Sequence, residues 1–200
     1  MHLTCWRCGA RVSNDYPDTT NLIVRGTIEC PECAEKDEPL FKVGVGVGVA
    51  LIRFVMKGSW AVPHVLLGKR KGAHGEGQYS LPGGRLEPDE SPIRGAIREL
   101  KEETGLDFVR DLESLSVDTS VPFNNVITGG QPWTTLYFTG EIKRSAVPRV
   151  MEPDKCEGWD FVSTDGLPAP LFNAFYAYAH SKGWNVEQQE NWDSVHQGRK

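Results

Sequence analysis

The strongest alternating pattern in the chain runs from Val43 to Ile52, where valine and glycine take turns along the sequence. Apolar residues at every second position are typical of a β-strand. Glycine on the opposite face of that strand indicates that another group packs close to the backbone there. Further strands are predicted in shorter apolar stretches, at residues 64–68, 79–81, 114–121, 134–142 and 158–162.

A helical period replaces this alternation after residue 91. Ile93, Ile97 and Leu100 are spaced so that they share one face of a helix. The Ser-Pro pair just before them supplies a favourable N-cap and a first-turn proline, and Gly105 can end the helix. A second helix is predicted at residues 171–182. Mixed strands with two helices predict an α/β layered domain.

The composition is that of one ordinary domain plus a small module. The chain has 200 residues, of which 39% are hydrophobic, and a formal net charge of −5. That charge excludes a global attraction to nucleic acid or to an anionic membrane surface. No apolar run approaches the roughly 18 residues of a membrane span, and the N-terminus lacks the apolar segment of a signal peptide. We therefore expect a cytoplasmic protein without a membrane partner.

Four of the five cysteines form two pairs with two-residue spacing, Cys5 with Cys8 and Cys30 with Cys33. Such spacing lets both thiolates of a pair turn towards one ion, and two pairs complete the tetrahedral ligand set that Zn²⁺ prefers. Two disulfides in a secreted module are the alternative, which the lack of a secretion signal disfavours. We therefore expect residues 1–38 to form a zinc ribbon whose folding energy comes from a structural Zn²⁺.

The most specific motif lies between Gly84 and Leu106. The segment has the spacing G-x₅-E-x₇-R-E-L-x-E-E-x-G-L, and it resembles the Nudix box of the Nudix hydrolase family, in which any aliphatic residue takes the leucine positions. A chance match has a probability on the order of 1 in 10⁸–10⁹ at each starting point. The charged positions of the box are Glu90, Arg98, Glu99, Glu102 and Glu103.

Three of these carboxylates have a spacing that favours metal binding on physical grounds alone. Glu99, Glu102 and Glu103 stand at i, i+3 and i+4, so on a helix they share one face and repel one another. Hard divalent cations such as Mg²⁺ relieve that repulsion. The alternative is a solvated charge run that Arg98 and Lys101 partly neutralise, and the register with the surrounding glycines disfavours it.

The resemblance implies a fold and a metal centre. The fold is an α/β/α sandwich with a mixed sheet, expected here at residues 40–185 and followed by a polar tail at residues 186–200. The cofactor implied is Mg²⁺ or Mn²⁺, which would grip a diphosphate group and activate a water. Its ligands would be three carboxylates and one main-chain carbonyl, from Glu99, Glu102, Glu103 and Gly83.

The resemblance also implies roles in catalysis. Glu99 would position or deprotonate the attacking water, and Arg98 and Glu90 would orient the carboxylates through an ion pair. In this family a further carboxylate often joins the metal site from a later loop. Three residues of this chain qualify, and the sequence does not choose between them: Glu152, Asp154 and Glu157.

From about residue 43 to residue 175 the chain is similar to the MutT-type branch of the family, which hydrolyses nucleoside triphosphates, oxidised ones included, to a monophosphate and pyrophosphate. The similarity lies in residues 66–70, 81–84, 124–126 and 151–161. It implies a small-molecule nucleotide as substrate. The residues it places near that substrate are His74 (for stacking on a base), Ser80, Arg70 and Asp154. An exposed loop histidine and ordinary strand or surface roles are the alternatives.

Other functions stay open. NADH pyrophosphatases carry a four-cysteine ribbon before a Nudix domain, and some act on NAD-capped RNA. Their Ser-Gln-Pro-Trp-Pro-Phe-Pro signature is echoed here only by Gln131-Pro132-Trp133, far downstream in a predicted hairpin. A nucleotide-sensing adaptor is the third hypothesis, and the complete set of box carboxylates disfavours it. The ribbon holds no basic patch, so nucleic-acid binding through it is not favoured, and a homodimer stays open.

Overall fold

The computed structural model describes residues 3–4, 11–12, 43–72, 75–128 and 131–186. The chain divides into two compact units, residues 1–42 and residues 43–200. In the first unit, strand β1 (Leu3–Thr4) pairs antiparallel with strand β2 (Arg11–Val12). The four cysteines of the predicted zinc ribbon lie outside the described residues, so the ribbon stays a prediction.

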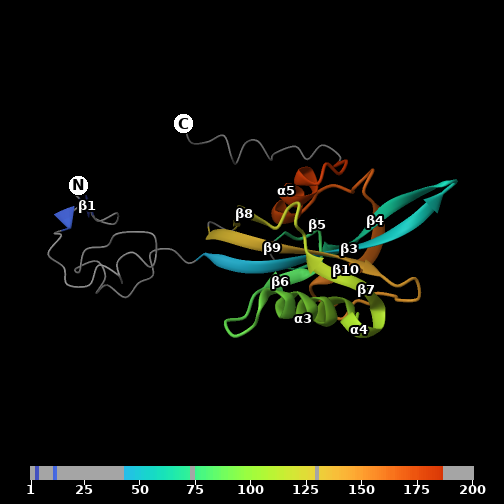
Figure 1. Ribbon diagram of the computed structural model, residues 1–200, viewed down its shortest axis with the longest axis horizontal. Helices are drawn as coiled ribbons and strands as arrows, with labels where there is room; N and C mark the ends of the chain where they lie inside the picture. Colours follow the sequence, from blue (N-terminus) through green and yellow to red (C-terminus); the bar gives the residue numbers. More distant parts are fainter. Residues whose placement is uncertain (1–2, 5–10, 13–42, 73–74, 129–130, 187–200) are drawn as a thin grey trace. The chain divides into compact units, whose positions relative to one another are not determined.

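The second unit is built around one mixed sheet (Figure 1). Its strands are β3 (Gly44–Lys57), β4 (Trp60–Arg70), β5 (Tyr79–Ser80), β6 (Gly83–Arg85), β7 (Leu112–Val117), β8 (Phe123–Thr128), β9 (Gln131–Ile142) and β10 (Cys156–Ser163). The long path runs β10-β4-β3-β9-β7, with β5 paired to β4, β6 to β3 and β8 to β9. β3 and β9 are parallel, whereas the other described pairs of this sheet are antiparallel.

Helices cover both faces of the sheet (Figure 1). Helix α3 (Pro92–Thr104) packs on one face and helix α5 (Asn173–Ser181) on the other, while the short helix α4 (Phe108–Asp111) leads into β7. The alternation along β3 divides the core, because Val49 and Leu51 pack with Leu100 of α3 whereas Ala50 packs with Tyr178 of α5. This arrangement confirms the predicted α/β/α sandwich with a mixed sheet.

The helix boundaries follow the sequence signals more closely than the strands do. Gly105 ends α3 with a left-handed φ of 68°, a conformation that costs glycine little. Ser91 stands at the N-cap, but its side chain makes no capping hydrogen bond. β8 escaped the sequence pattern because its adjacent Asn124 and Asn125 are more typical of a turn than of a strand. None of the described helices is long and apolar enough to cross a membrane.

Candidate active site

A glycine turn presses the backbone of β6 against the carboxylates of α3. Gly83 has a φ of 150°, and a Cβ atom there would collide with the carbonyl oxygen of Val47. A Cβ atom at Gly84 would lie 2.5 Å from Oε1 of Glu99. The amide of Gly83 donates to Oε2 of Glu103 at 2.9 Å. Only glycine permits this approach, and it places a main-chain segment directly beside two of the box carboxylates.

Arg98 is the hub of the charged residues in the box. Its Nη2 and Nε donate to the two carboxylate oxygens of Glu90 at 2.6 and 3.1 Å. Its Nη1 donates to Oε1 of Glu99 at 2.9 Å and to Oε2 of Glu102 at 3.1 Å. Nη2 also donates to the carbonyl oxygen of Arg85 at 3.1 Å. One guanidinium therefore connects the helix to β6 and orients two acidic side chains, which is the geometry expected of an orienting ion pair.

Three glutamates of the box line a cavity of about 310 Å³, here called the carboxylate cavity. Glu99, Glu102, Glu103 and Glu152 line it together with Gly83 and Gly84. Burial raises the pKa of Glu103 to about 8; the amide of Gly83 opposes the rise, and the neighbouring carboxylates Glu99 and Glu152 add to it. Burial also raises the pKa of Glu99, which Arg98 opposes. The cavity thus gathers acidic groups whose ionised forms water solvates poorly.

The chemistry of this donor set fits a hard divalent cation. Four glutamates line one cavity, and Mg²⁺ and Mn²⁺ prefer oxygen ligands such as their carboxylates. Within the described residues, no three or more His, Cys, Asp or Glu side chains already stand as a closed ligand group. Hydrogen bonds keep these carboxylates apart: Arg98 donates to Glu99 and Glu102, while the amide of Gly83 donates to Glu103.

The three later carboxylates, which the sequence left open, separate in the structure. Glu152 lines the carboxylate cavity, where its carboxylate also pairs with Lys155 at 2.7 Å. Glu157 pairs instead with Lys69 at 3.0 Å. Asp154 and Glu157 do not line the carboxylate cavity, nor do they line the second cavity described below. The placement therefore favours Glu152 as the additional acidic residue and does not bring Asp154 to the site.

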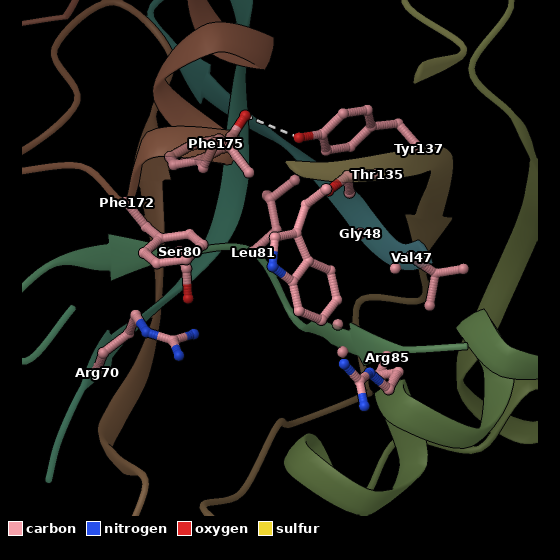
Figure 2. A pocket seen from close by; sticks show the side chains of 15 residues that line it. Val47, Gly48, Arg70, Ser80, Leu81, Arg85, Thr135, Tyr137, Phe172 and Phe175 are labelled. Atoms are coloured by element: carbon pink, nitrogen blue, oxygen red, sulfur yellow. Dashed lines mark hydrogen bonds between the residues drawn. The ribbon is translucent and has the colours of Figure 1, made fainter. Parts of the chain in front are cut away.

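A second cavity of about 250 Å³, here called the aromatic cavity, adjoins the first. Its lining includes the β3 glycines Gly46 and Gly48 and the rings of Trp133, Phe172 and Phe175. The alternating glycines of β3 predict close packing, and the structure confirms it. A Cβ atom at Gly48 would lie 2.9 Å from the ring of Tyr137, whose hydroxyl donates to the carbonyl oxygen of Ala174 at 2.7 Å (Figure 2). Flat aromatic rings along a glycine strand suit a planar ligand.

The two cavities share a wall that carries two arginines. Arg70 and Arg85 line both cavities, as Ser80 does. Figure 2 shows both guanidinium groups at the same end of the aromatic cavity, on opposite sides of it. The Cζ atom of Arg70 lies 4.5 Å from the ring centroid of Phe172, and that of Arg85 lies 5.1 Å from the ring centroid of Trp133. Each cation is thus backed by an aromatic face.

The structure brings together most of the residues singled out from the sequence. The cavity linings include Ser80, Arg70, Gly83, Glu99, Glu102 and Glu103. Arg98 and Glu90 line neither cavity but connect to Glu99 through hydrogen bonds, and His74 lies outside the described residues. Phe172 lines the aromatic cavity, and its neighbour Leu171 is fully buried in the core. The sequence reasoning did not single out Arg85 or assign Trp133 to the pocket. The alternating glycines of β3 predicted that a group packs close to the backbone, but they did not identify the residue.

Comparison with known proteins agrees with the box. The family model described as the NUDIX domain matches residues 44–181. Among curated proteins, the RNA pyrophosphohydrolase of Bartonella tribocorum is 27% identical over 109 residues, and that of Bartonella clarridgeiae is 31% identical over 103 residues. Each match covers 46% of this chain, and the chain spans only 60% of the length of these relatives.

Solved structures show the same fold. A MutT NUDIX hydrolase from Burkholderia pseudomallei is 30% identical with a TM-score of 0.57, covering 70% of this chain and 98% of that one. The NUDIX domain of Shewanella oneidensis NrtR, complexed with ADP ribose, has a TM-score of 0.54 at 18% identity, covering 76% of this chain and 95% of that one. With the box, the sandwich and the clustered carboxylates in place, the chain belongs to the Nudix hydrolase family.

Proposed function

We propose that this Nudix hydrolase cleaves nucleoside triphosphates, oxidised or otherwise modified ones included, to a monophosphate and pyrophosphate. One observation carries the proposal: a cavity walled by aromatic rings adjoins a cavity walled by carboxylates, and two arginines stand on the shared wall. A base would occupy the aromatic cavity, the phosphates would follow the shared wall, and the reacting phosphorus would reach the carboxylates. The likeness to a MutT hydrolase supports the same substrate class.

The roles of the acidic residues follow from their contacts. Glu99, Glu102, Glu103 and the carbonyl of Gly83 would hold Mg²⁺ or Mn²⁺, with Glu152 as a further ligand. When bound, the cation supplies Lewis-acid stabilisation of the charge on the transferring phosphoryl group. Glu99 would accept the proton of the attacking water, and its burial suits this role because a raised pKa makes the carboxylate a better base. Arg98 and Glu90 would position Glu99.

A product assay tests the proposal. The enzyme with Mg²⁺ is offered a panel of dNTPs, 8-oxo-dGTP, methylated and deaminated nucleotides, ADP-ribose, NADH and NAD-capped RNA, with the Glu99→Gln variant as the blank. Pyrophosphate together with a monophosphate from at least one triphosphate supports the proposal and names the base. Turnover of the other substrates with triphosphates left intact refutes it.

One further function has an observation of its own. The Bartonella relatives are named RNA pyrophosphohydrolases, so RNA with a 5′-triphosphate joins the panel as the second candidate substrate. NADH cleavage stays an alternative; the Gln131-Pro132-Trp133 echo of its signature lies in β9, and Trp133 lines the aromatic cavity. Two monophosphates from NADH would support it. A nucleotide-sensing adaptor would show binding without any turnover.

We further propose that residues 1–38 form a ribbon around one structural Zn²⁺, followed by the hydrolase domain at residues 40–185 and a tail at residues 186–200. The Cys-x₂-Cys pairs support the ribbon. Metal analysis of protein purified without added zinc should find one zinc per chain, and Cys5→Ser should lose it. Full zinc content in that variant would refute the ribbon, and a zinc-dependent gel shift with RNA would give it a nucleic-acid role.

A further inference from the structure

The side chain of Arg85 has a setting unlike that of the box arginine. Its backbone is fixed on two sides, by the β6 pairing with Gly46 and by the bond from Arg98 to its carbonyl. Its guanidinium is solvent-exposed and lines both cavities. Arg98 is held by three carboxylates, whereas within the described part of the chain Arg85 forms no ion pair with any carboxylate. Arg85 therefore has a fixed backbone and a guanidinium that pairs with no carboxylate of the described residues, and it lies where the two cavities meet.

The indole ring of Trp133 positions the guanidinium of Arg85. A Cβ atom at Gly44 would collide with the indole ring, so the ring lies directly against the backbone of β3. The guanidinium of Arg85 stands over the ring at 5.1 Å. A guanidinium over an aromatic face keeps its N–H groups available at its edges, where they can donate to phosphate oxygens. Trp133 therefore holds Arg85 at the boundary and leaves its donors free for a ligand.

The electrostatics of the site call for such a cation. An anionic substrate that approaches the carboxylate cavity meets Glu99, Glu102, Glu103 and Glu152. Two lysines line that cavity: Lys155 is already paired with Glu152, and Nζ of Lys71 donates to the carbonyl oxygen of Pro153 at 3.3 Å. Planar guanidinium groups bind phosphate oxygens through two parallel charge-assisted bonds, so a substrate gains binding energy when its phosphate chain is long enough to reach Arg85.

We propose that Arg85 is a substrate-binding residue that selects nucleotides bearing a 5′-triphosphate, with Trp133 as the aromatic support that positions its guanidinium. The inference rests on the proposed function and deepens it. The selected chemistry is the triphosphate itself, which a free nucleotide or the 5′ end of an RNA can supply. Arg85 contacts the phosphate chain, whereas the carboxylates and Arg98 serve the reacting centre.

Steady-state kinetics of Arg85→Gln tests the inference, with Arg94→Gln as the matched control. Arg94 is exposed on α3 and lines neither of the cavities formed by described residues here. We expect Arg85→Gln to raise KM for triphosphates about tenfold to a hundredfold, the effect of losing a charge-assisted contact, while kcat changes much less. The preference for triphosphates over the matching diphosphates should fall by a similar factor. Arg94→Gln should behave as the wild type.

Companion variants separate binding from packing. Arg85→Lys keeps the charge but not the planar fork, so its KM should lie between wild type and Arg85→Gln. Trp133→Phe should retain most of the affinity and Trp133→Ala should not. Nucleotide binding should quench tryptophan fluorescence in the wild type, and Trp133→Phe should lose part of that quenching. Unchanged KM and unchanged triphosphate preference in Arg85→Gln, in an active enzyme, would overturn the inference.

Two further experiments identify the source of the triphosphate and separate a failure of the proposed function from a failure of the inference about Arg85. Free nucleotide and 5′-triphosphorylated RNA are compared in the wild type, and the arginine variant should weaken both. If the wild type turns over no triphosphate, calorimetric binding of a non-hydrolysable triphosphate replaces kinetics. Weaker binding by Arg85→Gln would then uphold the inference while the proposed function fails. Equal binding by both proteins, or no binding by either, would overturn the inference.

Discussion

The guanidinium of Arg98 grips Glu90 at two points, with Nη2 donating at 2.6 Å and Nε at 3.1 Å. The same guanidinium reaches Glu99 through Nη1 at 2.9 Å. Glu90 thus anchors Arg98, and Arg98 in turn orients Glu99. The hydrogen bonds from Arg98 hold the pKa of Glu90 below its usual range, so Glu90 is ionised at neutral pH.

Glu90→Gln should weaken metal activation more than it weakens the fold. Without its anchor Arg98 is free to pair more closely with Glu99 and Glu102, which then compete less well for a cation. The Mg²⁺ concentration for half-maximal activity should rise about 10- to 100-fold, the usual range when a residue that orients a metal ligand is lost. A Mg²⁺ titration measures it. Glu87→Gln is the control, because Glu87 is exposed and 4.0 Å from Arg98. Equal Mg²⁺ dependence in all three proteins would contradict the role given to Glu90.

Glu99→Gln should remove about a hundred- to ten-thousandfold of kcat, the range over which a general base contributes. Gln has the same shape and removes a carboxylate whose pKa burial raises, so the fold should survive. The melting temperature should stay within about 4 °C of the wild type, which corresponds to 1–2 kcal/mol in a chain of this size. Initial rates and thermal melts are measured beside Glu113→Gln, an exposed carboxylate on β7. Full activity in Glu99→Gln would assign the proton transfer elsewhere.

The acidic half of the site could be predicted because its spacing is local. Glu99, Glu102 and Glu103 share one helix face through the period of the helix alone, and Gly105 marks where that helix ends. The motif also implied the partner of Arg98 across eight residues. Such relationships depend on one helix and one loop, so a single sequence holds the information.

The aromatic half could not be predicted in the same way. Trp133 meets Gly44 only because β9 pairs in parallel with β3 at one particular register, which is a long-range property of the sheet. The choice of Glu152 over Asp154 likewise depends on the turn taken by one loop. The glycines of β3 indicated that something would pack there, yet nothing in the alternation identified a tryptophan, a tyrosine or a pocket.

Gly48→Val should damage the aromatic cavity. A Cβ atom at this position already approaches the ring of Tyr137 to 2.9 Å, so two further methyl groups must displace the ring and its bond to Ala174. We expect a loss of about 1–3 kcal/mol of stability from overpacking and a higher KM for every nucleotide that is cleaved. Urea unfolding and kinetics are compared with Gly166→Ala, where a Cβ atom meets nothing within 4 Å. An unchanged KM would show that the base binds elsewhere.

Asp118 should make the stability of the domain depend on pH. Its buried carboxylate accepts from the hydroxyl of Tyr178 at 2.5 Å, from Nζ of Lys182 at 3.0 Å and from the hydroxyl of Ser120 at 2.7 Å. Burial alone would raise the pKa of Asp118, but these donors outweigh it and hold the pKa well below its usual range. The cluster ties the β7–β8 connection to α5, the helix whose first turn supplies Phe175 to the aromatic cavity.

The sign of the effect follows from that shift. A carboxylate whose pKa is lower in the folded state contributes stability above its unfolded pKa of about 4, and loses it as the pH falls towards the folded value. Asp118→Asn should therefore cost about 2–3 kcal/mol at pH 7, and the difference from wild type should shrink as unfolding is repeated at pH 5, 4 and 3. Asp165→Asn, at an exposed site, should show no such trend. A difference that stays constant with pH would mean that the loss of stability does not come from the charge of Asp118.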